Sequence, residues 1–174
     1  MATTDTVTLL FSTFADQGEL LGRPERTVTR QIQLFEKLVN EAVATCGGRE
    51  AQWLGDGMMA VFRSAGDAVR CAIAVQQFGR RATAGWRGGI RVGLHVGETP
   101  SGRSAYGVTL LAARKLCDRA SAGQVLCGKL IAGLLSEHPD FQFRDVPEIE
   151  SHGSTASGAV CEVIYQRDDP AVLL

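Results

Sequence analysis

The stretch QWLGDGMMAVF, residues 52–62, predicts a β-hairpin. Gly55, Asp56 and Gly57 form its expected tight turn, because glycine tolerates the positive φ angles that such turns require. Residues 58–62 are apolar throughout, which is typical of a buried strand, and residues 50–54 are expected to form its partner. Asp56 then has two interpretations: it is a turn residue, or it holds a metal ion at the tip of the hairpin.

The segments around this hairpin alternate between strand-like and helix-like patterns. Before it, apolar residues recur at steps of three and four positions over residues 24–45, which predicts a long amphipathic helix. Further strands are expected at 6–11, 90–96, 125–127, 141–146 and 160–165, and further helices at 65–81, 108–120 and 131–136. The order β-α-β-β-α-β, extended by an extra helix and strands, predicts an α+β fold with a ferredoxin-like core.

Length and composition restrict the class of protein. The chain has 174 residues, a formal net charge of −1 and only 6% aromatic residues. We expect one domain over residues 1–166, followed by a tail or linker stub at 167–174. Without a cluster of Lys and Arg or many aromatic side chains, neither a nucleic-acid backbone nor stacked bases are expected partners.

The chain is also expected to be cytoplasmic. Its start has no basic region before the first apolar run, so no signal peptide is predicted. No apolar run approaches the ~20 residues that a membrane-spanning helix needs. The five cysteines are widely spread and none forms a CxxC pair. This spacing favours reduced thiols over a zinc site or a disulfide framework.

Four segments together point to a known family. They are VTLLFST at 7–13, GGREAQWLGDGMMAVF at 47–62, IRVGLHVGE at 90–98 and YGVTLLAARKLCDRASAGQVL at 106–126. In this order they resemble the class III nucleotide cyclase catalytic domain (the cyclase homology domain) in its compact bacterial style. The resemblance covers roughly residues 5–166, and four ordered segments are far more specific than any one motif.

The resemblance implies a reaction and a set of site residues. Members of the family convert a nucleoside triphosphate into a 3′,5′-cyclic monophosphate, and they work as head-to-tail dimers. Two aspartates hold two metal ions, which activate the attacking hydroxyl and clamp the polyphosphate. A Lys and an Asp read the purine. An Asn and an Arg come from the opposite subunit, and the Arg offsets charge that grows in the transition state.

At the metal positions, this sequence keeps one carboxylate of two. Asp56 matches the second metal aspartate. Thr13 replaces the first, and a neutral hydroxyl supplies no charge to offset two dications. Asp16 is the only nearby carboxylate that could stand in, but we expect it to cap a turn.

The nucleotide positions depart further. Gln52 replaces the purine-reading Lys; it can still hydrogen-bond a base edge, or it is simply a solvent-facing strand residue. YGVTLLAAR is one residue shorter than the family pattern, with the gap placed at the purine-reading Asp. Leu110 replaces the Asn. Arg114 keeps the transition-state position, although it could equally be a helix-surface arginine paired with a nearby carboxylate.

These departures predict a degenerate cyclase homology domain. We expect little or no turnover, a regulatory or dimerisation role, and at most weak binding of ATP or GTP. A homodimer is expected, and Mg²⁺ or Mn²⁺ only if the domain is active; otherwise no cofactor is firmly bound. The alternatives are an active adenylate or guanylate cyclase with unusual site residues, alone or completed by a second cyclase domain in a heterodimer, and an unrelated ferredoxin-like binding module.

Overall fold

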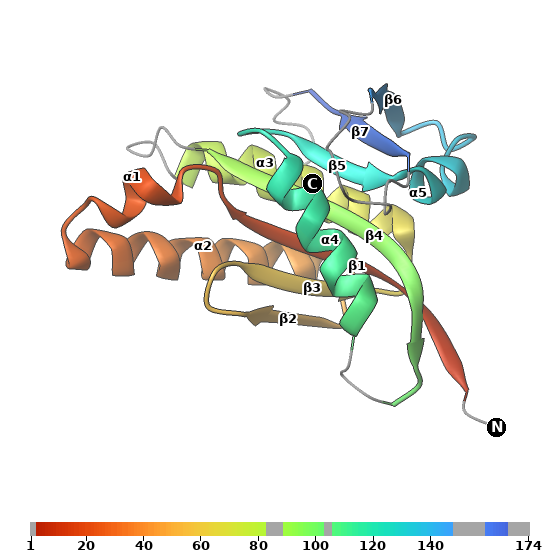
Figure 1. Ribbon diagram of the computed structural model, residues 1–174, viewed down its shortest axis with the longest axis horizontal. Coiled ribbons are helices and arrows are strands. Elements are labelled where there is room, and N and C mark those ends of the chain that lie inside the picture. The colour runs from red at the N-terminus through yellow and green to blue at the C-terminus, as the bar shows by residue number, and fades with distance from the viewer. Residues whose placement is uncertain (1–2, 83–88, 103–105, 148–158, 167–174) are drawn as a thin grey trace, which may run out of the picture.

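A seven-stranded mixed sheet, in the order β2-β3-β1-β4-β5-β7-β6, forms the centre of the computed structural model (Figure 1). The structure describes residues 3–82, 89–102, 106–147 and 159–166. The strands are β1 (Thr4–Phe14), β2 (Glu50–Trp53), β3 (Met58–Phe62), β4 (Ile90–Pro100), β5 (Val125–Gly128), β6 (Gln142–Val146) and β7 (Val160–Ile164). The helices are α1 (Gln17–Leu21), α2 (Glu25–Thr45), α3 (Ala65–Ala82), α4 (Gly107–Arg119) and α5 (Lys129–Leu134).

The expected α+β fold and the order β-α-β-β-α-β are confirmed. β1 lies between β3 and β4 and is antiparallel to both, β4 is parallel to β5, and β7 is antiparallel to β5 and β6. The short helix α1 lies between β1 and the long helix α2. The tail at 167–174 lies outside the described residues, so its prediction as a linker stub stays untested.

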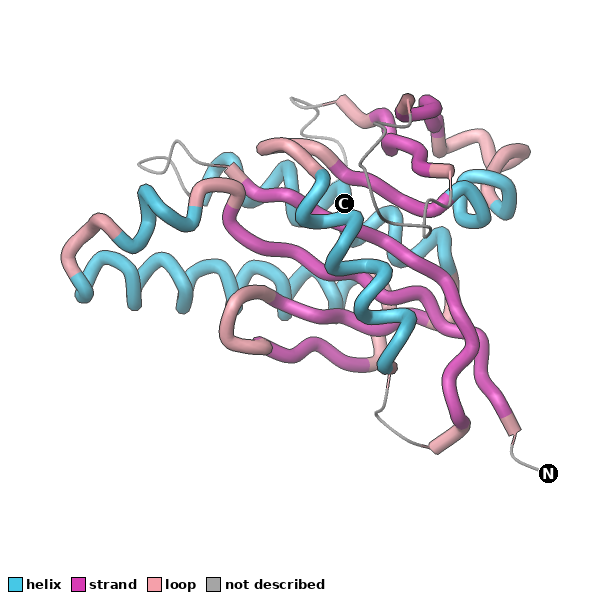
Figure 2. The backbone as a smooth tube through the Cα atoms, viewed as in Figure 1, coloured by secondary structure: helices cyan, strands magenta, loops and turns pink. Residues whose placement is uncertain are grey.

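β1 and β4 are longer than expected. They pair with each other along their whole length, from Thr4 opposite Pro100 to Phe14 opposite Ile90. Figure 2 shows their joined ends extending beyond the rest of the sheet. These ends contain the polar residues Thr4, Asp5 and Thr99, so they show no apolar run in the sequence. Backbone pairing between the two strands forms the ladder there.

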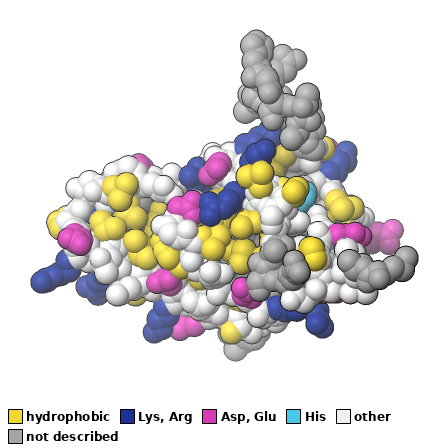
Figure 3. All heavy atoms as spheres, turned by 60° about the horizontal axis from the view of Figure 1, so that its bottom comes forward, with side chains coloured by type: hydrophobic (Ala, Val, Ile, Leu, Met, Phe, Trp, Pro, Cys, Tyr) yellow, Lys and Arg dark blue, Asp and Glu magenta, His cyan; other side chains and the backbone are white. Residues whose placement is uncertain are grey.

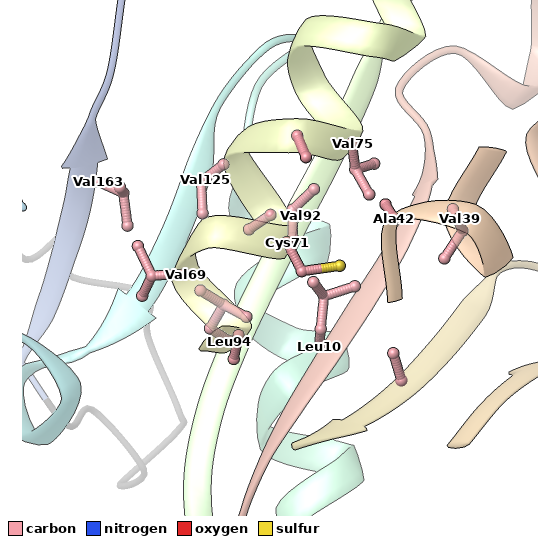
Figure 4. Packing of buried hydrophobic residues seen from close by; sticks show 14 of the residues in the cluster. Leu10, Val39, Ala42, Val69, Cys71, Val75, Val92, Leu94, Val125 and Val163 are labelled. Carbon is pink, nitrogen blue, oxygen red and sulfur yellow. The ribbon is translucent and has the colours of Figure 1, made fainter. Parts of the chain in front are cut away.

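The two faces of the sheet are covered by different helices. On one face α2 and α3 pack over a core that includes Leu10, Val39, Val75 and Val92 (Figure 4). On the other face α4 covers a smaller cluster, which we call the α4 cluster: Val7, Leu9, Phe11, Met59, Val61, Ala113 and Cys117. Alternate residues of β1 supply the two cores, because successive side chains of a strand point to opposite faces.

A glycine lets α4 lie close against β4. A β-carbon on Gly93 would overlap the Ala113 carbonyl oxygen and the Cys117 amide nitrogen, both in the backbone of α4. Gly93 is therefore needed for close approach and not for an unusual backbone angle. The position of α4 determines where Arg114 emerges.

The hairpin turn is confirmed, but its two glycines have different roles. Gly55 has a φ of +96°, as expected for the turn. Gly57 has no positive φ. Its role is steric, because a β-carbon there would lie 2.6 Å from both the Phe11 ring and the Ser12 carbonyl oxygen. The expectation that both glycines serve positive φ was wrong for Gly57.

Among the described residues, no helix is both long and apolar enough to cross a membrane. The cytoplasmic location stays a prediction.

Candidate functional site

Thr13 joins the end of β1 to the hairpin. Its side chain is only 1% exposed. The Thr13 hydroxyl donates a hydrogen bond to the main-chain carbonyl oxygen of Asp56, at 2.5 Å. It accepts one from the Gln17 side-chain amide, at 3.0 Å, and the same amide lies 3.4 Å from the Asp56 carbonyl oxygen. At the first metal position, the hydroxyl therefore donates its one proton to the turn and accepts a hydrogen bond from α1.

Asp56 and Arg114 pair with each other within one chain. The guanidinium donates two hydrogen bonds to the carboxylate, from Nη1 to Oδ2 at 2.6 Å and from Nη2 to Oδ1 at 3.0 Å. Its carbon lies 4.3 Å from the centre of the Phe11 ring, a cation–π contact. The side chains are 29% exposed for Arg114 and 52% for Asp56. The two retained family residues thus neutralise one another in the isolated chain, while their roles in metal and transition-state binding stay predictions.

The donor set does not fit a two-metal centre. Thr13 is neutral and bonded, and both oxygens of Asp56 face Arg114. Asp16, the one carboxylate that could substitute, caps α1 by accepting a hydrogen bond from the Glu19 amide at 2.8 Å. Over the described ranges, no three His, Cys, Asp or Glu side chains are placed to hold a metal ion. Hard dications need several oxygen ligands, and here they are not assembled.

Gln52 and Leu110, the two positions implied for nucleotide contacts, differ in their exposure to solvent. Gln52 is exposed on β2, opposite Met59 of β3. Leu110 is half-buried and packs against the α4 cluster. Leu110 therefore serves this subunit's own core, which an outward-facing position would not do. The strongly exposed apolar side chains of α4 are its neighbours, Val108 at 83% and Leu111 at 51%.

A polar cavity that sequence reasoning missed lies at the opposite end of β1. Its volume is about 240 Å³, and its lining includes Asp5, Arg49, Glu50 and Tyr106. The Tyr106 hydroxyl donates a hydrogen bond to Glu50, at 2.9 Å, and burial, together with this carboxylate, raises the pKa of Tyr106. Tyr106 belongs to the YG motif quoted from the sequence. No local pattern indicated that it contacts Glu50, which lies more than fifty positions away. The cavity is separate from the Thr13 site, because eight residues of β1, roughly 26 Å, lie between Asp5 and Thr13.

Solved structures identify the fold. The chain matches the adenylyl cyclase CyaB from P. aeruginosa with a TM-score of 0.80 at 20% identity, covering 97% of this chain and 98% of that one. It matches an adenylate/guanylate cyclase/hydrolase from Silicibacter pomeroyi with a TM-score of 0.79 at 22% identity, covering 95% and 100%. The guanylate cyclase domain of RhGC from Catenaria anguillulae, solved in complex with GTP, gives 0.77 at 17% identity, covering 94% and 98%.

This chain therefore has the fold of class III adenylyl and guanylyl cyclase domains, and the resemblance seen in the four sequence segments is confirmed at that level. A sheet of unrelated order, expected for an unrelated ferredoxin-like module, is not what the structure shows.

Sequence relatives are mycobacterial. The chain is 32% identical over 139 residues to the uncharacterized protein Rv0891c of Mycobacterium tuberculosis, covering 76% of this chain and 47% of that protein. It is also 32% identical over 123 residues to the uncharacterized protein Rv1359 of the same organism, covering 69% and 47%. The chain thus spans about half the length of the curated relatives it matches. No protein-family model matches it.

Proposed function

We propose that this cyclase-fold domain has little or no catalytic turnover and acts as a regulatory, dimerising signalling module with at most weak binding of ATP or GTP. One observation supports this more than any other. Neither implied metal position offers a free carboxylate, because Thr13 is a bonded hydroxyl and Asp56 is paired with Arg114. A reaction that relies on metal-bound phosphates lacks its anchoring groups in this arrangement.

The substitution at position 13 supports low turnover more strongly than the ion pair does. Separating a partly exposed pair such as Asp56–Arg114 costs about 1 kcal/mol at most, which is about fivefold in an equilibrium. Binding of a ligand could supply that much. A missing carboxylate cannot be recovered by a side-chain movement, and loss of even one transition-state donor costs ~10²–10³ in rate. The substitution at position 13 is therefore the main basis for proposing inactivity.

Turnover by the purified domain tests the proposal. We expect no cyclic nucleotide from ATP or GTP, with either Mg²⁺ or Mn²⁺, when products are identified by mass spectrometry. The variant Thr13→Asp/Gln52→Lys/Leu110→Asn runs beside the parent, and Thr13→Asn in the same background is its matched neutral control. Product from the parent would contradict the proposal.

Folding of these variants has to be followed separately, because residue 13 is buried. If the aspartate creates a metal site, Mn²⁺ should raise the melting temperature of the Thr13→Asp variant and leave that of the Thr13→Asn control unchanged. Activity gained only by the aspartate variant would show that the rest of the site is still in place.

A second candidate function is one half of an active heterodimer. Within the described part of the chain, Arg114 is held by the ion pair and the Phe11 ring, and 29% of its side chain is exposed. A partner domain could therefore draw it away. That partner would have to supply both metal carboxylates and the purine-reading groups. Mixing this chain with such a cyclase domain should then raise cyclic-nucleotide production, and an Arg114→Gln variant should not.

A further inference from the structure

The cavity beside Tyr106 lies where the ends of β1 and β4 leave the rest of the sheet. The pairing of β3 with β1 stops at Thr8, so among the described residues β4 is the only strand that pairs with residues 4–7. The Tyr106 hydroxyl donates its hydrogen bond to Glu50 and so joins the start of α4 to the start of β2. Figure 1 shows these two starts side by side. The cavity is therefore built from segments that lie far apart in the sequence.

Side chains of both charges line this cavity. Asp5 and Arg49 are both exposed. Within the described part of the chain, neither side chain takes part in a hydrogen bond or an ion pair. A guanidinium presents its donors in a planar fork that suits a carboxylate, and a carboxylate accepts hydrogen bonds from an ammonium group. The lining thus offers one group to an anion and another to a cation.

Neutral residues complete the lining. Val7, which is 2% exposed, and Pro100 contribute apolar surface, against which methylene groups are favourably buried. Thr99 is 4% exposed, and its hydroxyl lies 3.5 Å from the main-chain oxygen of Asp5, a long hydrogen bond. The cavity volume of about 240 Å³ equals that of about eight water molecules of ~30 Å³ each. The space therefore suits a small molecule with an aliphatic part.

We propose that this cavity binds a small zwitterion in which a short aliphatic chain separates a carboxylate from an amine, the class that includes lysine. Arg49 holds the carboxylate, Asp5 holds the ammonium group, and Val7 and Pro100 contact the chain. The two carboxylates and one guanidinium of the lining leave a net charge of −1. A ligand with a net charge of zero or +1 complements that charge.

The position of the ligand gives it a regulatory use. It would contact both partners of the Tyr106–Glu50 hydrogen bond. One partner precedes the hairpin that carries Asp56, and the other begins the helix that carries Arg114. The zwitterion is thus a small-molecule signal for the regulatory module. Its binding rests on the cavity and not on low turnover, so the two proposals fail independently.

Amide chemical shifts of the ¹⁵N-labelled chain test the proposal, with 6-aminohexanoate as the probe. We expect saturable shifts at Arg49, Glu50 and Tyr106. Hexanoate and hexylamine each lack one end of the probe. They should bind about tenfold more weakly or worse, because each loses a hydrogen-bonded contact to a charged group. Lysine should bind at least as tightly as the probe. The absence of saturable shifts at these three residues, or equal affinity for hexanoate or hexylamine, would overturn the proposal.

Two variants separate the ends of the ligand. Asp5→Asn and Arg49→Gln nearly preserve side-chain size at exposed positions, and each should weaken 6-aminohexanoate binding about tenfold. Asp5→Asn should bind hexanoate as the parent does, and Arg49→Gln should bind hexylamine as the parent does. Arg26→Gln, at the other end of α2, is the matched control and should leave the affinity unchanged. Parent-like affinity for the probe in both Asp5→Asn and Arg49→Gln would refute the assignment, and circular dichroism checks that each variant is folded.

Discussion

The ion pair between Asp56 and Arg114 should be measurable as a coupling free energy in unfolding. Arg114→Gln removes the charge and the cation–π contact with Phe11, whereas Asp56→Asn keeps the turn chemistry and removes only the charge. Exposed ion pairs contribute ~0.2–1 kcal/mol. The two-pronged geometry and the 29% exposure of Arg114 place this pair near the upper end, about 1 kcal/mol.

The single variants should therefore differ. Asp56→Asn should destabilise the domain by about 1 kcal/mol, and Arg114→Gln by about 1.5–2 kcal/mol, because a partly exposed cation–π contact adds ~0.5–1 kcal/mol. The double variant should cost no more than Arg114→Gln alone, since the pair is already broken. The cycle then gives a coupling of about 1 kcal/mol.

Urea denaturation followed by circular dichroism measures these values, at one fixed protein concentration so that association contributes equally. Lys37–Glu41 on α2 is the control pair. It is 3.9 Å apart with both side chains more than two-thirds exposed, and should couple by only ~0.3–0.5 kcal/mol. A coupling for Asp56–Arg114 below about 0.3 kcal/mol, within the scatter of independent sites, would refute the conclusion that the two residues neutralise each other.

Two other predictions concern α4. Gly93→Ala should destabilise the domain by ~1–3 kcal/mol in thermal unfolding, because the added methyl group meets the backbone of α4. Gly133→Ala on α5 is the control. A β-carbon has open space there, so this variant should be neutral or stabilising. The proposed dimer should use the exposed Val108 and Leu111, so Val108→Asp/Leu111→Asp should shift sedimentation toward monomer. Leu21→Asp in α1, where the leucine is 75% exposed, is the control and should not. Unchanged association in the first variant would exclude this face from the interface. Figure 3 shows hydrophobic side chains forming a broken band across one side of the molecule, with charged side chains beside it.

Much of the fold could be predicted from the sequence because its elements follow simple periods. The apolar repeat of α2 and the continuous apolar run of β3 identify those elements directly. The ends of β1 and β4 could not be predicted, since Thr4, Asp5 and Thr99 show no apolar alternation and are ordered by pairing with a strand about ninety residues away. Long-range pairing of this kind has no local signature.

The candidate site could be predicted in its positions but not in its contacts. The motifs placed Thr13 and Asp56 near each other, and the sequence predicted Asp16 as a cap, which the structure confirms. The pairing of Arg114 with Asp56 was one of two alternatives, because a motif gives spacing and not the direction of a side chain. The cavity beside Tyr106 was missed, as its lining comes from strands and loops far apart in the sequence.

The hydrogen-bonded turn at Thr13 also restricts how a carboxylate could be introduced at position 13. An aspartate at position 13 would bring a negative charge against the Asp56 carbonyl oxygen that now accepts the Thr13 hydroxyl hydrogen. The Gln17 amide alone would remain as a donor to both oxygens. Thr13→Asp alone should therefore be less stable than its parent until a cation is present. A carboxylate at position 13 has to pass through that less stable state or follow a change at Gln17, so the order of substitutions matters as much as their identity.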